Sequence, residues 1–144
     1  MRRERRLLAA LLLMAALGVL AGCGSQEEKQ EEPRQEEEED RIRIGLSFDT
    51  FVLERWQRDR DAFVARASEL GAEVNVQNAN GDVEEQIAQI EYLIEKDVDV
   101  IAVIAVDSRG LSDVVAKAKR AGIRVIAYDR LLTDAGVDLY ISFD

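Results

Sequence analysis

The sequence predicts an α/β fold built on an open, doubly wound parallel sheet, and three observations lead to this prediction. From residue 41 onward, short apolar runs alternate with longer stretches in which apolar residues recur at spacings of three and four. The strongest run, VDVIAVIAV at 98–106, is almost continuously apolar, as expected for a strand buried on both faces. Strands and helices alternate along the chain, which favours a parallel sheet over a meander.

Five strands are expected. They cover residues 42–48, 74–76, 98–106, 123–128 and 139–143. The first four are separated by helical patterns, so the predicted order is βαβαβαβ followed by a last short strand.

Three helices are expected between these strands, each with an apolar stripe. The stripes consist of Trp56, Phe63, Val64, Ala67 and Leu70 in the first helix; Ile87, Ile90, Leu93 and Ile94 in the second; and Leu111, Val114, Val115 and Ala118 in the third. Gly71 and Gly122 are predicted to end the first and third helices in a left-handed conformation. Asp82, with Glu85 three residues later, is the expected N-cap of the second helix, and Ser108 that of the third.

Composition excludes several classes of protein. The chain has 144 residues, room for one ordinary domain. Its net charge of −10 argues against nucleic-acid binding, which needs a surplus of basic residues. The absence of His and the single Cys exclude a His-based triad, a clustered His/Cys zinc site and an intrachain disulfide. We expect no catalytic residue, cofactor or metal, and a monomer; chemistry by a carboxylate pair, Asp49 and Asp129, stays open as an enzyme alternative.

The amino terminus is typical of an export signal. Four arginines within the first six residues precede the apolar run 7–20, which is short for a membrane span but sufficient for a signal peptide. The following residues, Leu20-Ala21-Gly22-Cys23, look like the lipobox of bacterial lipoproteins. That resemblance implies cleavage after residue 22 and lipidation of Cys23. An uncleaved membrane anchor or a buried helix is the alternative to the signal peptide, and a free thiol is the alternative to a lipidated Cys23.

Residues 24–40 read GSQEEKQEEPRQEEEED and contain no large apolar side chain. Such a segment has nothing to bury, so 23–40 is expected to be a lipidated cysteine followed by a disordered acidic tether. An acidic docking tail is the alternative. The protein is therefore expected to be exported and lipid-anchored to a membrane, facing the periplasm or the cell exterior.

In doubly wound sheets, ligands bind beyond the carboxyl ends of the strands. Polar residues follow the predicted strand ends: Asp49 and Thr50, residues 78–81, Asp107 and Ser108, and Asp129 and Arg130. The stretch SFDTFVLERW after the first strand contains no glycine, so a dinucleotide fingerprint is not predicted. A receiver-type phosphorylation site at Asp49 and Asp129 would need further partners and a cytoplasmic location.

A neutral polyol suits these residues better. Arg55 and Trp56 after the first strand, with Asp129 and Arg130 after the fourth, offer charge-assisted hydrogen bonds and an aromatic face, the two kinds of contact that hold sugars. Each residue also has a structural interpretation. Trp56 can pack against the sheet, Arg55 can pair with Asp59 at i+4, and Asp129-Arg130 can simply end a strand.

Three motifs resemble the periplasmic D-xylose-binding proteins of bacterial ABC transporters, within the sugar-binding periplasmic binding protein family. They are LERWQRDRDAFV (53–64), QNANGD (77–82) and AYDRLLTDAGVDLYISFD (127–144). The resemblance implies that Arg55, Trp56, Asp129 and Arg130 contact a pentose, with Asp49 as a weaker transfer. It also implies a periplasmic-binding-protein-like fold that closes on its sugar and docks on an ABC permease.

We therefore expect residues 41–144 to be the amino-terminal part of the sugar-binding lobe of a substrate-binding lipoprotein for D-xylose or a related monosaccharide. The resemblance implies an incomplete first lobe without a second lobe, and hence weak or no binding by this chain alone. The alternative is a periplasmic sugar sensor that partners a membrane histidine kinase or chemoreceptor. A repressor effector domain would require an amino-terminal helix-turn-helix, which 1–40 does not contain.

Overall fold

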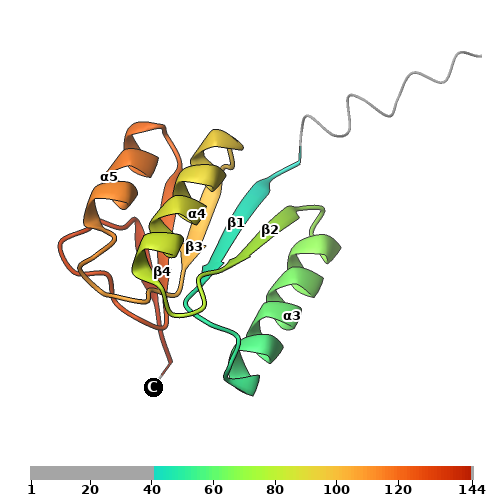
Figure 1. Ribbon diagram of the computed structural model, residues 1–144. Helices are drawn as coiled ribbons and strands as arrows, with labels where there is room; N and C mark the ends of the chain where they lie inside the picture. Colours follow the sequence, from blue (N-terminus) through green and yellow to red (C-terminus); the bar gives the residue numbers. More distant parts are fainter. Residues whose placement is uncertain (1–40, 144) are drawn as a thin grey trace, which may run out of the picture. The chain divides into compact units, whose positions relative to one another are not determined.

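A computed structural model describes residues 41–143 of the chain. The elements are β1 Arg43–Phe48, α3 Glu54–Glu69, β2 Glu73–Asn78, α4 Val83–Glu95, β3 Val100–Val103, α5 Ser112–Arg120, β4 Arg124–Tyr128 and β5 Leu139–Ile141. The strands form one sheet in the order β2-β1-β3-β4-β5, and every neighbouring pair is parallel. The predicted α/β fold with its parallel sheet is therefore confirmed (Figure 1).

Helices cover both faces of the sheet. The chain leaves β1 toward β2, returns past β1 to β3, and continues outward to β4 and β5. This reversal places α3 on one face and α4 with α5 on the other (Figure 1). Because the order reverses beside β1, the carboxyl ends of β1 and β3 flank the switch point where ligands bind in such sheets.

Side chains alternate between the two faces of the sheet along each strand, and the buried residues accordingly form two apolar clusters, one on each face. One lies under α4 and α5 and includes Ile90, Leu93, Ile101, Val103, Val114, Val115, Val125 and Ala127. The other lies under α3 and consists of Leu46, Phe48, Trp56, Ala102 and Ile104. Successive strand residues point to opposite faces, so β3 contributes Ile101 and Val103 to one cluster and Ala102 to the other.

The ends of α3 and α4 follow the sequence prediction, with one exception. The Asp82 carboxylate accepts hydrogen bonds from the backbone N–H groups of Glu84 (2.9 Å) and Glu85 (3.2 Å), and so caps α4. Gly71 follows α3 with a φ of 79°, in the left-handed region. Leu70, expected in the buried stripe of α3, is instead 68% exposed, because it follows the helix as its C-cap.

The start of α5 and the extent of β3 differ from the prediction. Ser108 does not cap α5, which begins at Ser112. A turn intervenes in which Asp107 Oδ1 accepts from the N–H groups of Arg109 (2.7 Å) and Gly110 (2.9 Å). The strand expected at 98–106 is shortened to β3, although Ile104 and Ala105 stay buried beyond its end.

A buried polar side chain, Gln86, fastens α4 to the sheet. Its Nε2 donates to Ser47 Oγ (3.1 Å) and to the carbonyl of Ile104 (2.9 Å), while its Oε1 accepts from the N–H of Val106 (2.8 Å). These bonds satisfy backbone groups at the point where the β3 ladder has ended.

None of the helices within 41–143 combines the length and the apolar character that a membrane span requires. The predicted signal peptide (1–22), the lipidated Cys23 and the acidic tether (23–40) lie outside the described residues.

Candidate functional site

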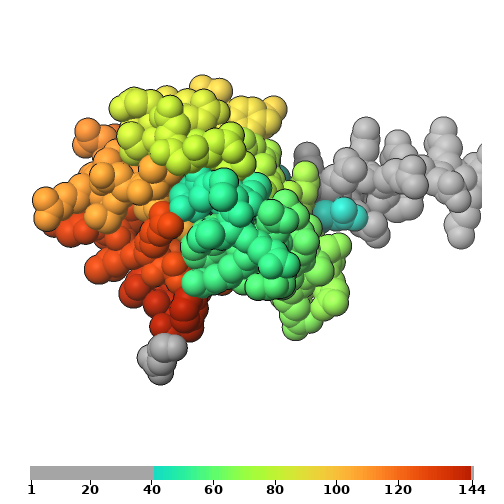
Figure 2. All heavy atoms as spheres, turned by 60° about the horizontal axis from the view of Figure 1, so that its bottom comes forward, coloured from blue at the N-terminus to red at the C-terminus, as the bar shows by residue number. Residues whose placement is uncertain are grey.

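The five residues singled out from the sequence meet at the carboxyl edge of the sheet. Asp49 follows β1, Arg55 and Trp56 lie in the first turn of α3, and Asp129 and Arg130 follow β4. In Figure 2, which brings this edge forward, the teal atoms after β1 and at the start of α3 lie beside the red atoms near the carboxyl end. Two segments about 75 residues apart thus form one surface.

Arg130 joins β1 and β3 at this edge. Its Nη2 lies 2.7 Å from Oδ2 of Asp49, and its Nη1 donates to the carbonyl of Ala105 at 2.7 Å. The Asp49 side chain is only 6% exposed. A carboxylate so deeply buried requires a charged partner, and Arg130 supplies it while leaving much of its own side chain open to solvent.

Arg55 forms the second ion pair. Its Nη2 lies 2.9 Å from Oδ1 of Asp129, and its Nε lies 3.6 Å from Oδ2 of Asp59. The guanidinium carbon lies 4.5 Å from the centre of the Trp56 ring and 4.1 Å from that of Phe143. The i+4 pair expected for a purely structural Arg55 is therefore present, together with a long-range pair to Asp129.

Trp56 belongs to the core as well as to the edge. It is 2% exposed and packs edge-on against Phe48, with ring centres 6.1 Å apart. The Arg130 guanidinium carbon lies 6.0 Å from its ring. Packing against the sheet, one of the two interpretations left open by the sequence, is thus present, and the guanidinium groups of Arg55 and Arg130 lie over the ring. Its Nε1 has no hydrogen-bond partner among the described residues.

The backbone at Asp129 is held in an unusual conformation. Its φ is 63°, a left-handed value at which Asp is enriched among non-glycine residues. The Asp129 N–H donates to the carbonyl of Ile141 (2.7 Å), and its carbonyl accepts from Tyr140 Oη (3.1 Å). Strand β5 therefore fixes the turn that directs the Asp129 carboxylate toward Arg55.

A further pair, Tyr128 and Asp59, lies behind Arg55. Tyr128 Oη donates to Oδ2 of Asp59 at 3.1 Å. Burial raises the pKa of the Tyr128 phenol, and the charge and hydrogen bond of Asp59 raise it further. Sequence reasoning named Asp59 only as an i+4 partner and missed Tyr128, Tyr140 and Phe143. The YDR motif itself contained the one available signal, a Tyr directly before Asp129.

The other strand-end residues stabilise the loops at this edge, within one loop or between two. The N–H of Gly81 donates to the carbonyl of Asp49 at 2.7 Å, so the loop after β2 buttresses the one after β1. The two hydrogen bonds from the N–H groups of Arg109 and Gly110 lower the pKa of Asp107. Ser108 contributes its carbonyl to Thr133 N–H.

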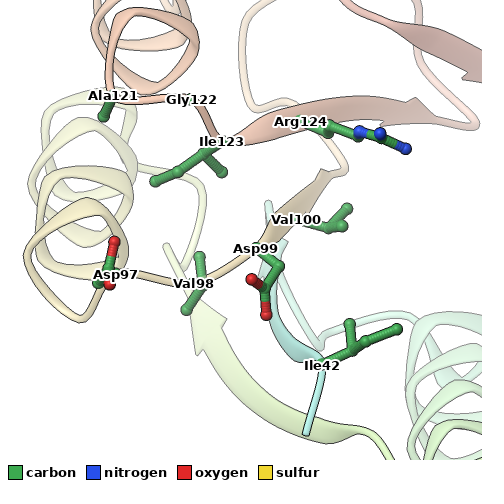
Figure 3. A pocket seen from close by; sticks show the side chains of 9 residues that line it. All are labelled: Ile42, Asp97, Val98, Asp99, Val100, Ala121, Gly122, Ile123 and Arg124. Carbon is green, nitrogen blue, oxygen red and sulfur yellow. The ribbon is translucent and has the colours of Figure 1, made fainter. Parts of the chain in front are cut away.

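A pocket of about 410 Å³ lies at the opposite, amino edge of the sheet (Figure 3). It is lined by Ile42, Asp97, Val98, Asp99, Val100, Ala121, Gly122, Ile123 and Arg124. Both of its carboxylates are engaged by Arg43: Asp99 Oδ2 accepts from the Arg43 N–H (2.7 Å), and Asp97 pairs with the Arg43 guanidinium (3.3 Å). We assign the candidate site to the carboxyl edge, where arginine and carboxylate groups converge. The described part of the chain contains no cluster of side chains suited to hold a metal ion.

Comparison with known proteins places the chain in a family. The family model for the Periplasmic binding protein domain matches residues 44–144. D-xylose-binding periplasmic proteins of Escherichia coli and Haemophilus influenzae are each 52% identical over 103 residues, 72% of this chain and 31% of theirs. The resemblance drawn from the sequence motifs is therefore confirmed.

Solved structures agree. An ABC transporter solute binding protein from Clostridium phytofermentans with bound β-D-glucose is 35% identical and superimposes with a TM-score of 0.69, covering 71% of this chain and 32% of that one. A carbohydrate transporter solute binding protein from Chloroflexus aurantiacus in complex with D-glucose is 31% identical, with a TM-score of 0.65, over 70% of this chain and 30% of that one. This chain thus spans about a third of the length of these relatives, and it belongs to the periplasmic binding protein domain family.

Proposed function

We propose that this chain supplies one half of the sugar site of a substrate-binding protein for an ABC importer, and that the sugar is D-xylose or a related monosaccharide. The observation that carries the proposal is the pair of ion pairs, Arg130–Asp49 and Arg55–Asp129, that cross the carboxyl edge beside Trp56. The D-xylose-binding relatives, 52% identical, support the choice of sugar.

The pairs suit a neutral polyol for a physical reason. The Asp129 carboxylate can accept from a sugar hydroxyl, and the guanidinium groups of Arg55 and Arg130, both 41% exposed, can each donate to one, so both hydrogen-bonding functions of a hydroxyl find a charged partner. Because the arginine and aspartate charges offset each other, the site offers strong hydrogen bonds without selecting a charged ligand. Such bonds contribute about 1.5–3 kcal/mol each, enough for several of them to separate sugar epimers.

Calorimetric titration with D-xylose, D-ribose and D-glucose tests this proposal on two samples: the 144-residue chain, and the full-length protein, meaning this chain completed by any reading frame that follows it in the genome. Selective heat of binding with D-xylose is expected from the full-length protein, and weak or no binding from the 144-residue chain alone. A folded full-length protein that gives no heat with any of the three sugars would refute the assignment.

We further propose export, cleavage after residue 22 and lipid attachment at Cys23, on the strength of the arginine-rich start, the apolar run and the LAGC sequence. Metabolic labelling with a radioactive fatty acid in a bacterial host tests this step. The wild-type protein is expected to incorporate label and to sediment with membranes, whereas Cys23→Ser should lose both properties. Label on the Cys23→Ser variant would contradict lipidation at this residue.

The proposed partner is an ABC permease, to which the sugar-loaded protein would bind as a monomer. The decisive measurement is the ATPase rate of an ABC transporter from the same organism, reconstituted in proteoliposomes. Addition of the protein with D-xylose should stimulate ATP hydrolysis, and addition of either alone should not.

A further inference from the structure

We propose that Asp59, together with Tyr128, is a positioning residue that holds the guanidinium of Arg55 in place for ligand binding. The inference rests on the proposed sugar site and extends it to two side chains that are not among the five proposed sugar-binding residues. Asp59 lies one helical turn beyond Arg55 in α3, and Tyr128 is the last residue of β4.

The contacts of Arg55 show why positioning is needed. The side chain is long and 41% exposed, and an unrestrained arginine loses rotamer entropy whenever it is ordered by a ligand. Asp129 engages one end of its guanidinium through Nη2 at 2.9 Å. Asp59 lies 3.6 Å from Nε, a different nitrogen of the same guanidinium, so the two carboxylates hold the group at two points and together fix its position and orientation.

Tyr128 in turn fixes Asp59. Its hydroxyl donates to Oδ2 of Asp59 at 3.1 Å, and Oδ2 is the same oxygen that faces Nε of Arg55. The Asp59 side chain is 28% exposed, partly withdrawn from solvent. This contact connects the face of α3 directly to the end of β4, beside Asp129. Three side-chain contacts thus connect Tyr128, Asp59, Arg55 and Asp129 in that order, and the peptide bond between residues 128 and 129 closes the ring.

The arrangement differs from an ordinary surface ion pair. Arg58 and Glu54, four residues apart in the same helix, lie 3.5 Å from each other, with side chains 70% and 82% exposed. Such a pair contributes little, because solvent screens it. Arg55 instead lies over two aromatic rings, with its guanidinium carbon 4.5 Å from the centre of Trp56 and 4.1 Å from that of Phe143, and these contacts restrict its motion. Asp59 thus acts on a guanidinium that is already confined, and determines how it is turned.

The test compares Asp59→Asn and Tyr128→Phe with the control Asp61→Asn in the full-length protein. Asp61 lies in the same helix and, within residues 41–143, pairs only with the neighbouring Arg60, at 2.7 Å. Affinity for D-xylose is measured by calorimetry. The mobility and solvent exchange of the Arg55 Nε–H group are measured by nitrogen-15 NMR in the absence of sugar.

Asp59→Asn should weaken D-xylose binding by about tenfold, because the carboxylate charge that pairs with Nε of Arg55 is lost. It should also speed solvent exchange at Arg55 Nε–H. Tyr128→Phe should produce the same changes to a smaller degree, and Asp61→Asn should produce neither.

The two readouts separate this inference from the proposed function. An Arg55 Nε–H signal that is equally protected in the wild type and in Asp59→Asn would overturn the positioning role, whether or not the protein binds sugar. Wild-type protein without D-xylose affinity, but with an Arg55 signal that depends on Asp59, would refute the sugar assignment and retain the positioning. If Asp59→Asn does not fold, Tyr128→Phe decides through the same signal.

Discussion

Arg130 and Asp49 form an ion pair that joins two strands not adjacent in the sheet. Their Nη2 and Oδ2 atoms lie 2.7 Å apart, although Asp49 follows β1, Arg130 follows β4, and β3 lies between them. The second hydrogen bond of Arg130, to the carbonyl of Ala105, crosses the end of β3 itself. One guanidinium thus ties together the carboxyl ends of three strands.

The geometry of Arg130 predicts that Arg130→Lys weakens D-xylose binding by at least about tenfold, because an ammonium group cannot reproduce the two directed hydrogen bonds of the guanidinium fork. Calorimetric titration measures the loss. Arg58→Lys is the matched control, since among the residues that the structure describes Arg58 pairs only with the exposed Glu54. Equal affinities for the two variants would show that the fork of Arg130 is not needed for ligand binding.

The burial of Trp56 predicts a large stability effect. Trp56→Ala should lower the free energy of unfolding by about 3–5 kcal/mol, as for other buried aromatic residues. Urea denaturation followed by far-ultraviolet circular dichroism measures the change. The exposed Val52, 86% accessible, provides the comparison: Val52→Ala should cost less than about 0.5 kcal/mol. A loss below 1 kcal/mol for Trp56→Ala would mean that the ring is not a core residue.

Gln86 offers a test of buried hydrogen bonding. Gln86→Leu keeps a similar volume but leaves Val106 N–H, the Ile104 carbonyl and Ser47 Oγ without this partner. Each orphaned buried group costs about 1–3 kcal/mol, so we expect a loss of at least about 2 kcal/mol in unfolding free energy. Gln57→Leu on the exposed side of α3 should have a much smaller effect in the same urea titration.

The hydrogen bonds to the Asp138 carboxylate predict that the free energy of unfolding depends on pH. The Val125 N–H, which donates to Oδ2 at 2.8 Å, lowers the pKa of this carboxyl, and the hydrogen bond from Lys119 lowers it further. The pKa of Asp138 is thus lower in the folded chain than in the unfolded chain, where it is about 3.9. The ionised carboxylate therefore stabilises the fold at pH values above about 3.9, and this contribution is lost as the pH falls through the pKa of the folded state.

Urea midpoints at pH 6 and pH 2.5 test this dependence. The difference in urea midpoint between the wild type and Asp138→Asn should be larger at pH 6 than at pH 2.5, with the wild type the more stable. Asp134→Asn serves as the control, because Asp134 is exposed and Asn tolerates its positive φ of 59° equally well. A difference between wild type and Asp138→Asn that is the same at both pH values would contradict the assigned cause.

Much of the fold could be predicted from the sequence, because burial imposes a periodicity that local patterns retain. The apolar runs located all five strands, and Asp82 and Gly71 located helix ends, since each needs only neighbours within a few residues. The prediction that Ser108 caps α5 was wrong, and the cause is also local. The carboxylate of Asp107, one residue earlier, accepts the hydrogen bonds of the Arg109 and Gly110 N–H groups.

The candidate site was predictable only in part. The strand-end rule selected Asp49, Asp129 and Arg130 because it depends on topology alone. The contact between Tyr128 and Asp59 joins residues 69 positions apart, on a strand and a helix whose relative placement no spacing encodes. Gln86 is similar: it is a polar residue on an amphipathic helix, and only the end of the β3 ladder beneath it explains why it is fully buried.

In each of the two ion pairs the partners lie far apart in the sequence, and this separation determines when during folding the site can form. The unit β1–α3–β2 can pair through contacts close in the chain, but it contains Asp49 and Arg55 without their long-range partners. Asp129 and Arg130 arrive only when β4 pairs with β3, and Asp129 is oriented only when β5 adds to that edge. Contacts of such long range form slowly relative to local ones. Transient detachment of β4 and β5 would release both arginines at once, so amide hydrogen exchange at Asp129 should report directly on the fraction of molecules in which this edge is assembled.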